Sequence, residues 1–367
     1  MHAPRRSSIV RPTLAPVDRR VARRKVWISG LLILLCASCA PSGAPGAALT
    51  AQAVPSMLVW PPPPEAARIR FVTTLASPAD VGVRRSRIRR LVDAVFGRAE
   101  SRILQPYGVA VDAARRVFVT DTRARGVHVF DPVRKRYEFI GAVGKTAFKT
   151  PTGIAVDASG NLYIADSELG VVFSIDPAGR ERWRTRQPLA RPTGVALNLM
   201  DSVLYVVETQ GHRVVAFDLA GAELFAFGGR GEGAGELNYP TNATVGVDGE
   251  VYVTDALNFR VQMFGHHGEA VAAFGRHGDA VGDLARPKGI GLDSEGHVYV
   301  VEGLYDVVNV YSRAGTLLLS FGGSGRRPGE FWLATGLTID AGNRIYVADS
   351  YNSRVQVFEY LPTMPGS

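Results

Sequence analysis

The chain repeats itself six times after residue 105, and this repetition constrains its fold more than any other feature. The segment PTGIAVDASGNLYIADS (residues 151–167) aligns with segments that begin at Pro106, Pro151, Pro192, Pro240, Pro287 and Ala334. The spacings of 45, 41, 48, 47 and 47 residues are typical of propeller blades and other stacked repeat units. The chain is therefore predicted to fold as an array of similar units.

Each unit reads as four short β-strands. A run such as GIAVD is followed by a D-x-x-G-N turn, the run LYIAD, a loop, VVFSID, another turn and a fourth run that ends in FG. Short runs of β-forming residues between Gly, Asn and Asp predict strands joined by tight turns. The second and third runs are continuously apolar, which is typical of strands covered on both faces. The sequence thus predicts an all-β fold of four-stranded antiparallel units.

The motifs P-x-G-φ-A-φ-D, φ-Y-φ-A-D and N-x-R-φ-Q-φ-F resemble the NHL-repeat family of β-propellers over residues 106–361. The resemblance implies a six-bladed propeller. The sixth unit ends after its third strand, at RVQVFEYL, and in this family the missing outermost strand comes from elsewhere in the chain. We expect RIRFVTT (residues 68–74) to supply it and to close the ring, which also removes an exposed sheet edge.

The first 39 residues are typical of an export signal. A basic segment (residues 19–25) precedes an apolar run (residues 26–40) that is shorter than the ~20 residues of a transmembrane helix. Residues 37–39, Ala-Ser-Cys, resemble the lipobox of bacterial lipoproteins, although Cys36 stands where that motif usually has Leu. We expect Cys39 to be lipidated and the protein to be anchored in the bacterial envelope, on its periplasmic or surface side. Plain cleavage or an uncleaved anchor is the alternative.

Two segments connect the signal to the repeats. Residues 40–66 are rich in Ala, Pro and Gly and read as a tether. Residues 67–105 contain the expected closing strand and, at residues 84–98, apolar positions at helical spacing within a strongly basic segment. This short amphipathic helix either packs on the main domain or lies on an anionic membrane. Residues 362–367 form a short tail.

The net charge of +8 is unevenly distributed. Basic residues concentrate before residue 106, and residues 106–367 carry a net charge of −4. Because nucleic-acid surfaces require clustered Lys and Arg, we expect no nucleic-acid partner for the repeats.

An acid ends the second predicted strand of every unit. The six positions are Asp121, Asp166, Glu208, Asp255, Glu302 and Asp349. On a six-fold ring these carboxylates form a ring at one face. They either cap the following loop by accepting backbone N–H bonds or form a rim that attracts cations. We favour the structural role, because catalysis seldom needs six copies of one group.

A metal or catalytic site is not evident in the repeats. The seven histidines occupy different repeat positions, and the first strands begin P-Y-G, P-T-G, P-T-G, P-T-N, P-K-G and A-T-G. The similar peptidylglycine amidating lyases carry zinc on channel histidines, which are missing here. We therefore expect no cofactor and no metal. A lyase or lactonase type of propeller enzyme with calcium or zinc at the channel mouth remains the alternative.

The loops after the second strand differ most between units. Together with the connectors they present five aromatic residues: Tyr239, Phe259, Tyr305, Trp332 and Tyr351. Aromatic residues beside polar groups on scaffold loops are typical of protein or glycan contact surfaces; scattered exposed side chains are the alternative. The sequence predicts a lipid-anchored binding or scaffold module of the cell envelope, with its ligand at the loop face or the channel mouth. We expect the partner to be an envelope protein or a glycan, with membrane contact through the anchor and the basic helix.

Overall fold

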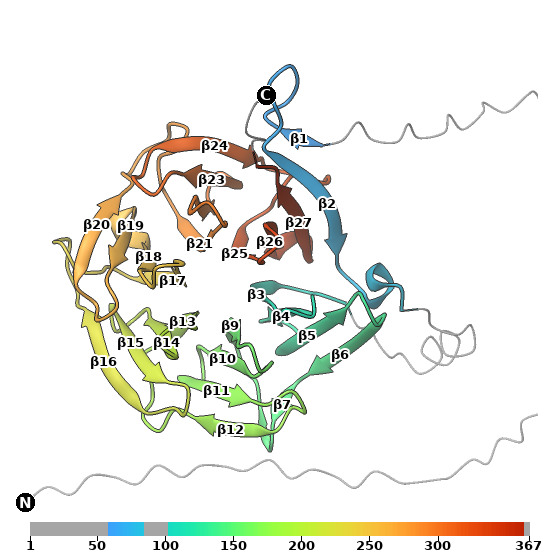
Figure 1. The fold of residues 1–367 in the computed structure, drawn as a ribbon. Coiled ribbons are helices and arrows are strands. Elements are labelled where there is room, and N and C mark those ends of the chain that lie inside the picture. The colour runs from blue at the N-terminus through green and yellow to red at the C-terminus, as the bar shows by residue number, and fades with distance from the viewer. Residues whose placement is uncertain (1–57, 84–101, 363–367) are drawn as a thin grey trace, which may run out of the picture. The chain divides into compact units, whose positions relative to one another are not determined.

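The computed structural model describes residues 58–83 and 102–362. Within them, six antiparallel sheets surround a central axis as the blades of a propeller (Figure 1), so the predicted all-β six-bladed fold is confirmed. The export signal, Cys39, most of the tether and the helix expected at residues 84–98 lie outside the described residues. No helix within them has the length and apolar character needed to cross a membrane.

The first three blades follow one another along the chain, each with its first strand innermost. Blade 1 contains β3 (Pro106–Val111), β4 (Val117–Asp121), β5 (Gly126–Asp131) and β6 (Arg136–Ile140). Between it and blade 2 lies a small hairpin of β7 (Ala142–Val143) and β8 (Thr146–Ala147). Blade 2 contains β9 (Pro151–Val156), β10 (Leu162–Asp166), β11 (Val171–Ile175) and β12 (Glu181–Arg184). Blade 3 contains β13 (Pro192–Asn198), β14 (Val203–Glu208), β15 (Arg213–Asp218) and β16 (Glu223–Gly228).

The remaining blades complete the ring. Blade 4 contains β17 (Pro240–Val245), β18 (Val251–Asp255), β19 (Arg260–Phe264) and β20 (Ala270–Phe274). Blade 5 contains β21 (Pro287–Leu292), β22 (Val298–Glu302), β23 (Val307–Tyr311) and β24 (Leu317–Gly322). Blade 6 contains β25 (Ala334–Ile339), β26 (Arg344–Asp349) and β27 (Arg354–Tyr360). Three 3-10 turns, η1 (Pro78–Val81), η2 (Ala256–Asn258) and η3 (Ser350–Asn352), are the helical elements of the described residues.

The hydrophobic core lies between neighbouring sheets. The second strands, such as β4 and β10, are buried along their whole length, which explains why their sequences are apolar without alternation. Between blades 3 and 4, for example, Tyr205 and Val207 pack with Val253 and Phe264. Each blade therefore depends on its neighbours for burial of its apolar faces.

Glycines let the innermost strands approach one another. Five of the six third positions in these strands are glycine: Gly108, Gly153, Gly194, Gly289 and Gly336. A Cβ atom on Gly108 would lie 2.4 Å from the carbonyl oxygen of Thr152, and one on Gly336 would lie 2.2 Å from that of Tyr107. A larger residue would therefore push adjacent blades apart.

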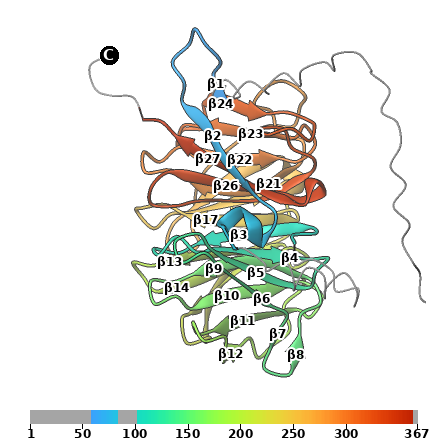
Figure 2. The same ribbon diagram turned by 90° about the vertical axis from the view of Figure 1, so that its right-hand side faces the viewer.

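A strand from before the repeats completes the last blade. β2 (Ile69–Leu75) pairs antiparallel with β27, with Ile69 opposite Tyr360 and Leu75 opposite Val355. β1 (Val59–Trp60) adds a fifth strand outside β2. Figures 1 and 2 show β2 lying along the outer side of blade 6. The ring is thus closed by hydrogen bonds between segments near opposite ends of the chain.

Ile69→Ala tests the contribution of β2 to stability. Ile69 is 1% exposed and packs with Phe358 and Tyr360, so its truncation should lower the free energy of unfolding by about 2–4 kcal/mol. Val72→Ala, on the same strand but 41% exposed, should change it by less than about 0.5 kcal/mol. Urea denaturation of both variants measures the difference. Equal losses would show that β2 does not anchor the last blade.

Candidate functional site at the mouth of the central channel

The connections between strands lie at two opposite ends of the channel. Because each blade is antiparallel, the loops between second and third strands share one end with the connectors that lead into the next blade. We call this end the loop face. The turns between first and second strands, and those between third and fourth strands, lie at the opposite end.

The acids that end the second strands are buried at the loop face. Asp121 accepts hydrogen bonds from the backbone N–H groups of Leu104 at 2.6 Å and Ala124 at 2.7 Å. It thereby joins the connector before β3 to the loop after β4. The other five acids also accept a bond from the connector before their own blade, donated by Lys149, Ala190, Asn238, Ala285 and Trp332. Each carboxylate therefore holds the loop face of its blade.

Side chains of the loop and of the third strand complete the hydrogen bonding of these carboxylates. Asp349 receives bonds from Arg354 at 2.7 Å, Asn352 at 2.9 Å and Gln356 at 3.1 Å. Burial raises the pKa of Asp349, against the effect of the hydrogen bonds from Trp332, Asn352 and Arg354. The Asn, Arg and Gln of the N-x-R-φ-Q pattern thus donate hydrogen bonds to the acid that precedes them.

In blade 1 a histidine occupies the position of that glutamine. His128 contacts Asp121 at 3.2 Å through Nε2 and the hydroxyl of Tyr137 at 2.8 Å through Nδ1. Although burial opposes it, the hydrogen bonds from His128 and from the backbone of Ala124 and Leu104 lower the pKa of Asp121. His128 therefore takes part in the same structural arrangement.

The five aromatic residues of the loop face divide into separate groups. The rings of Trp332 and Tyr351 lie 5.7 Å apart, and the guanidinium of Arg326 lies 4.7 Å from the Trp332 ring. Each of the other three contacts a different neighbour: Tyr239 packs on His212, Phe259 packs on His277, and Tyr305 donates to the carbonyl of Gly278. No ring contact within the described residues joins all five.

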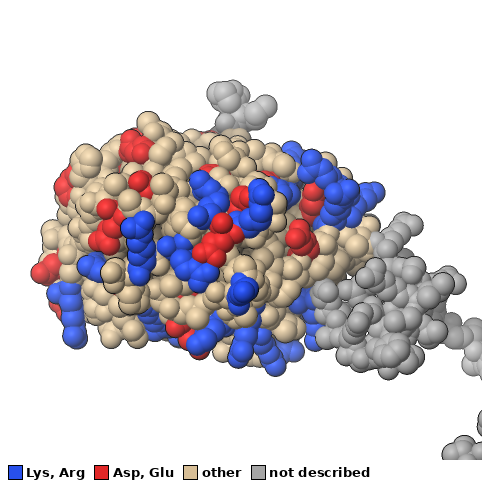
Figure 3. Space-filling model, turned by 90° about the horizontal axis from the view of Figure 1, so that it is seen from below, with Lys and Arg blue, Asp and Glu red and all other residues tan. Residues whose placement is uncertain are grey.

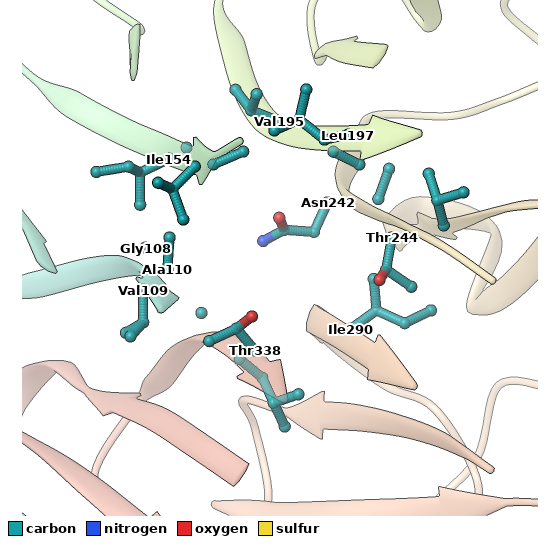
Figure 4. Close-up of a pocket in the computed structure, with 18 of the residues that line it drawn as sticks. Gly108, Val109, Ala110, Ile154, Val195, Leu197, Asn242, Thr244, Ile290 and Thr338 are labelled. Atoms are coloured by element: carbon teal, nitrogen blue, oxygen red, sulfur yellow. The ribbon is translucent and has the colours of Figure 1, made fainter. Parts of the chain in front are cut away.

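The central channel is lined mostly by aliphatic side chains. A cavity of about 220 Å³ lies within the innermost strands, and Figure 4 shows Asn242 projecting into its centre. Asn242 occupies the third strand position that is glycine in the other five blades. Within the described residues its side-chain amide has no hydrogen bond. The constriction therefore carries one polar side chain that breaks the six-fold pattern.

Hydroxyl groups join the innermost strands of neighbouring blades. In blades 2, 3 and 6 the second residue of the innermost strand pairs with the first residue after the second strand: Thr152 with Ser167, Thr193 with Thr209, and Thr335 with Ser350. Each pair also donates to a backbone carbonyl of the next blade. In blades 1 and 4 the hydroxyls of Thr120 and Thr254 make the equivalent bond. Five of the six junctions within the described ring thus share a hydroxyl bridge.

Blade 5 replaces this hydroxyl pair with Lys288 and Gly303. A Cβ on Gly303 would lie only 3.2 Å from Cγ of Lys288, so the glycine leaves room for the long side chain. In the described part of the chain, no hydroxyl of blade 5 bonds to β25, and the ammonium of Lys288 has no hydrogen bond or ion pair. Lys288 therefore does not replace the structural function of the threonine.

Two arginines and a tyrosine lie at the same end of the channel as Lys288. Burial and the charges of Arg286 and Arg191 together lower the pKa of Lys288 to about 8, against the opposing charge of Glu302. Burial also raises the pKa of Tyr107, against the same two arginine charges. Tyr107 and Lys288 are the second residues of innermost strands, and Arg191 and Arg286 directly precede two such strands, so all four residues lie at the loop-face end of the channel. We call Tyr107, Arg191, Arg286 and Lys288 the mouth cluster.

A pocket lies at the channel mouth beside two members of the mouth cluster, Tyr107 and Arg191. This pocket has a volume of about 650 Å³ and is lined by Tyr107, Thr152, Arg191 and Gln210 among others. Tyr107 and Thr152 also line the channel cavity, so the pocket adjoins it. Arg286 and Lys288 do not line the pocket, but in blade 5 they occupy the strand positions that Arg191 and Thr193 occupy in blade 3. The mouth offers cationic, phenolic, amide and hydroxyl groups to a ligand that enters from the loop face.

The mouth cluster and Asn242 were not among the site residues predicted from the sequence. The signal lay in the departures P-Y-G, P-T-N and P-K-G from the repeated P-T-G, and in the arginines directly before two of the first strands.

The histidines and acids of the described residues form separate pairs. His266 contacts Asp201 at 2.7 Å and His297 contacts Asp293 at 2.9 Å. Across residues 58–83 and 102–362 no group of three or more His, Cys, Asp or Glu side chains is placed to hold a metal ion. The cations of the mouth cluster would also repel a divalent cation at that position.

Comparisons with known proteins agree with the architecture. Residues 331–358, which include most of blade 6, match the NHL repeat model. Virginiamycin B lyase from Staphylococcus aureus superposes with a TM-score of 0.54 at 14% identity, covering 70% of this chain and 95% of the lyase. A protein of unknown function from Bacteroides thetaiotaomicron gives 0.56 at 15% identity, covering 80% and 75%. Hydrazine synthase from Kuenenia stuttgartiensis gives 0.51 at 12% identity, covering 71% and 97%. No curated protein sequence matches the chain. At such low identity these similarities establish the fold alone.

Lys288→Thr should stabilise the protein at neutral pH. The variant removes a partly buried charge and introduces threonine, which at the equivalent position of other blades takes part in the hydroxyl bridge to the next blade. The free energy of unfolding should therefore rise by about 1–3 kcal/mol at pH 7. The folded-state pKa of Lys288 is lowered to about 8, so above pH 8 the unfolded chain binds more protons than the folded chain. The destabilisation that Lys288 causes in the wild-type protein therefore decreases as pH rises toward 10.5. The difference in free energy of unfolding between the variant and the wild type should therefore decrease over that pH range.

Thermal and urea unfolding between pH 7 and 10 measure this effect. Lys145→Thr, at an exposed position, is the matched control and should change stability by less than about 0.5 kcal/mol. A Lys288→Thr variant that is less stable than wild type at pH 7 would contradict the prediction.

Proposed function

We propose that the protein is an exported, lipid-anchored binding module of the bacterial envelope, whose ligand enters the channel mouth at the loop face. The mouth cluster carries this proposal. Lys288 interrupts the pattern that joins the blades, and the three cationic side chains of the cluster have no partner within the described residues. Residues that break local structural rules without replacing the lost interaction are typical of functional sites.

The dimensions of the mouth suit a small ligand or one protruding group of a larger one. Its volume of about 650 Å³ falls within the ~300–1,000 Å³ of small-molecule sites. The buried carboxylates fix the surrounding loops, so the pocket is formed before a ligand arrives. Such preorganisation lowers the entropic cost of binding.

The alternative function, a lyase or lactonase type of enzyme with a divalent metal, has less support at this position. The fold is shared with the Staphylococcus aureus lyase, but fold does not determine chemistry. Arg191, Arg286 and Lys288 create a positive potential at the mouth, which favours anions over metal ions. A binding module agrees better with these charges.

The envelope location is supported by the leader and by Cys39 in its lipobox-like position. One side of the propeller carries Lys and Arg intermixed with Asp and Glu (Figure 3). A nucleic-acid surface would instead gather one sign of charge. We therefore propose a protein, a glycan or a small molecule of the envelope as the partner.

Cys39→Ala tests the anchor. If Cys39 is the lipidated residue, the variant should no longer incorporate a labelled lipid precursor and should leave the membrane fraction. Cys36→Ala is the matched control and should behave as wild type. Incorporation of label by the Cys39→Ala variant would contradict the proposed anchor.

A photo-crosslinking residue at position 210 tests the binding site. Gln210 is exposed and lines the mouth pocket, so p-benzoylphenylalanine at this position should form adducts in intact cells, detected as a mass shift. The same residue at position 178, in an exposed turn at the opposite end, should not form them. The same adducts at both positions, or none at position 210, would refute a site at the mouth.

A further inference from the structure

We infer that the channel mouth binds the negatively charged group of a small organic ligand, and that Arg191, Arg286 and Lys288 hold this group. The inference specifies the ligand class and therefore rests on the proposed binding site.

The first step is the charge balance at the mouth. Many other cations of the described surface are paired, as Arg260 is with Asp255 at 2.9 Å and Arg354 with Asp349 at 2.7 Å. Arg191, Arg286 and Lys288 have no such partner within residues 58–83 and 102–362.

The nearby carboxylates are already engaged. Glu302 is fully buried and accepts the backbone N–H groups of Ala285, Arg286 and Leu304. Glu168 contacts Lys149 at 3.5 Å and Thr150 at 3.0 Å. The mouth therefore keeps an excess of positive charge that a ligand can neutralise.

The second step is the geometry of the donors. Two guanidinium groups present planar pairs of N–H donors that suit carboxylate or phosphate oxygens, and the lysine adds a compact charge. The raised pKa of Tyr107 keeps its hydroxyl protonated, so this group can donate a hydrogen bond as well. The groups come from blade 1, from blade 5 and from the connector before blade 3, so they surround the channel opening. A carboxylate or a phosphate ester matches this set.

The third step concerns the uncharged part of the ligand. Below the mouth, the channel presents aliphatic side chains such as Val109, Ile154 and Val195, with the Asn242 amide at its centre (Figure 4). The surface exposed to the cavity is nevertheless mainly polar, so an uncharged group with hydrogen-bonding substituents would fit it. The anion therefore binds at the loop face, and the remainder of the molecule points into the channel.

The protonation of Lys288 gives the site a pH dependence. Lys288 faces the charges of Arg286, Arg191 and Glu302, and its pKa lies at about 8. At pH 7 it is mostly charged and attracts the anion, and this attraction weakens as pH rises through about 8. Affinity should fall as pH rises from 7 to 9, and the Lys288→Thr variant should lose most of this dependence.

Calorimetric titration of the full chain in detergent, with inorganic phosphate and with citrate as probes, tests the inference. The triple variant Arg191→Gln, Arg286→Gln, Lys288→Thr introduces residue types found at the equivalent positions of other blades, so folding should be preserved. We expect it to bind the better probe at least tenfold more weakly than wild type. Arg180→Gln, at an 81% exposed side chain in a turn at the opposite end, should leave affinity unchanged.

Two results would overturn the inference: no saturable binding of either probe by the wild type, or equal affinity in the triple variant. The crosslinking residue at position 210 separates this failure from failure of the proposed function. If the triple variant still forms the adduct in cells, the site is real but does not recognise charge. If the wild-type background forms none, the binding site itself is wrong.

Discussion

The loop face depends on one buried carboxylate at the end of each second strand. Burying a charge is unfavourable unless hydrogen bonds replace its hydration, and here backbone N–H groups do so. Asp121, for example, is fully buried and bonds to the connector on one side and to the loop on the other. Because the same arrangement is present in all six blades, the loop face is rigid without help from the residues that line the channel opening. Those residues are therefore free to vary.

In blade 5 the residues at the channel opening differ from the repeat, and this difference lowers the stability of the fold. The hydroxyl bridges of the other junctions are replaced by Lys288 and Gly303, which do not bridge to β25. The junction remains closed through other contacts: the backbone N–H of Leu333 bonds to Asp306 at 2.7 Å, and β2 completes the adjacent blade. A lysine with a lowered pKa is tolerated because the rest of the ring compensates. Such a loss of stability at one position is typical of sites selected for function.

The fold was predictable from the sequence because it arises from local patterns repeated at regular spacing. Strand runs, turns and the acids at strand ends recur in every unit, so one unit explains the others. The mouth cluster was not predictable in this way. Tyr107, Arg191 and Lys288 are far apart in the chain. They come to the same end of the channel only when the ring closes. Loops of successive blades lie around a ring, so Tyr239 and Phe259 each pack on a histidine near their own blade, while Trp332 and Tyr351 contact each other.

A six-fold scaffold separates structural from functional residues by symmetry. A residue that joins the blades is needed at every junction, so the structural role favours the same residue type six times, as with the acids and most of the threonines. A ligand has no six-fold symmetry, so its recognition requires different residues at equivalent positions. The lysine, the tyrosine and the asparagine at the innermost strands, together with the two arginines before them, are such differences, and they gather at one opening. In a propeller of this kind, the residues that depart from the repeat and gather at one place are therefore stronger evidence for a binding site than the residues that recur.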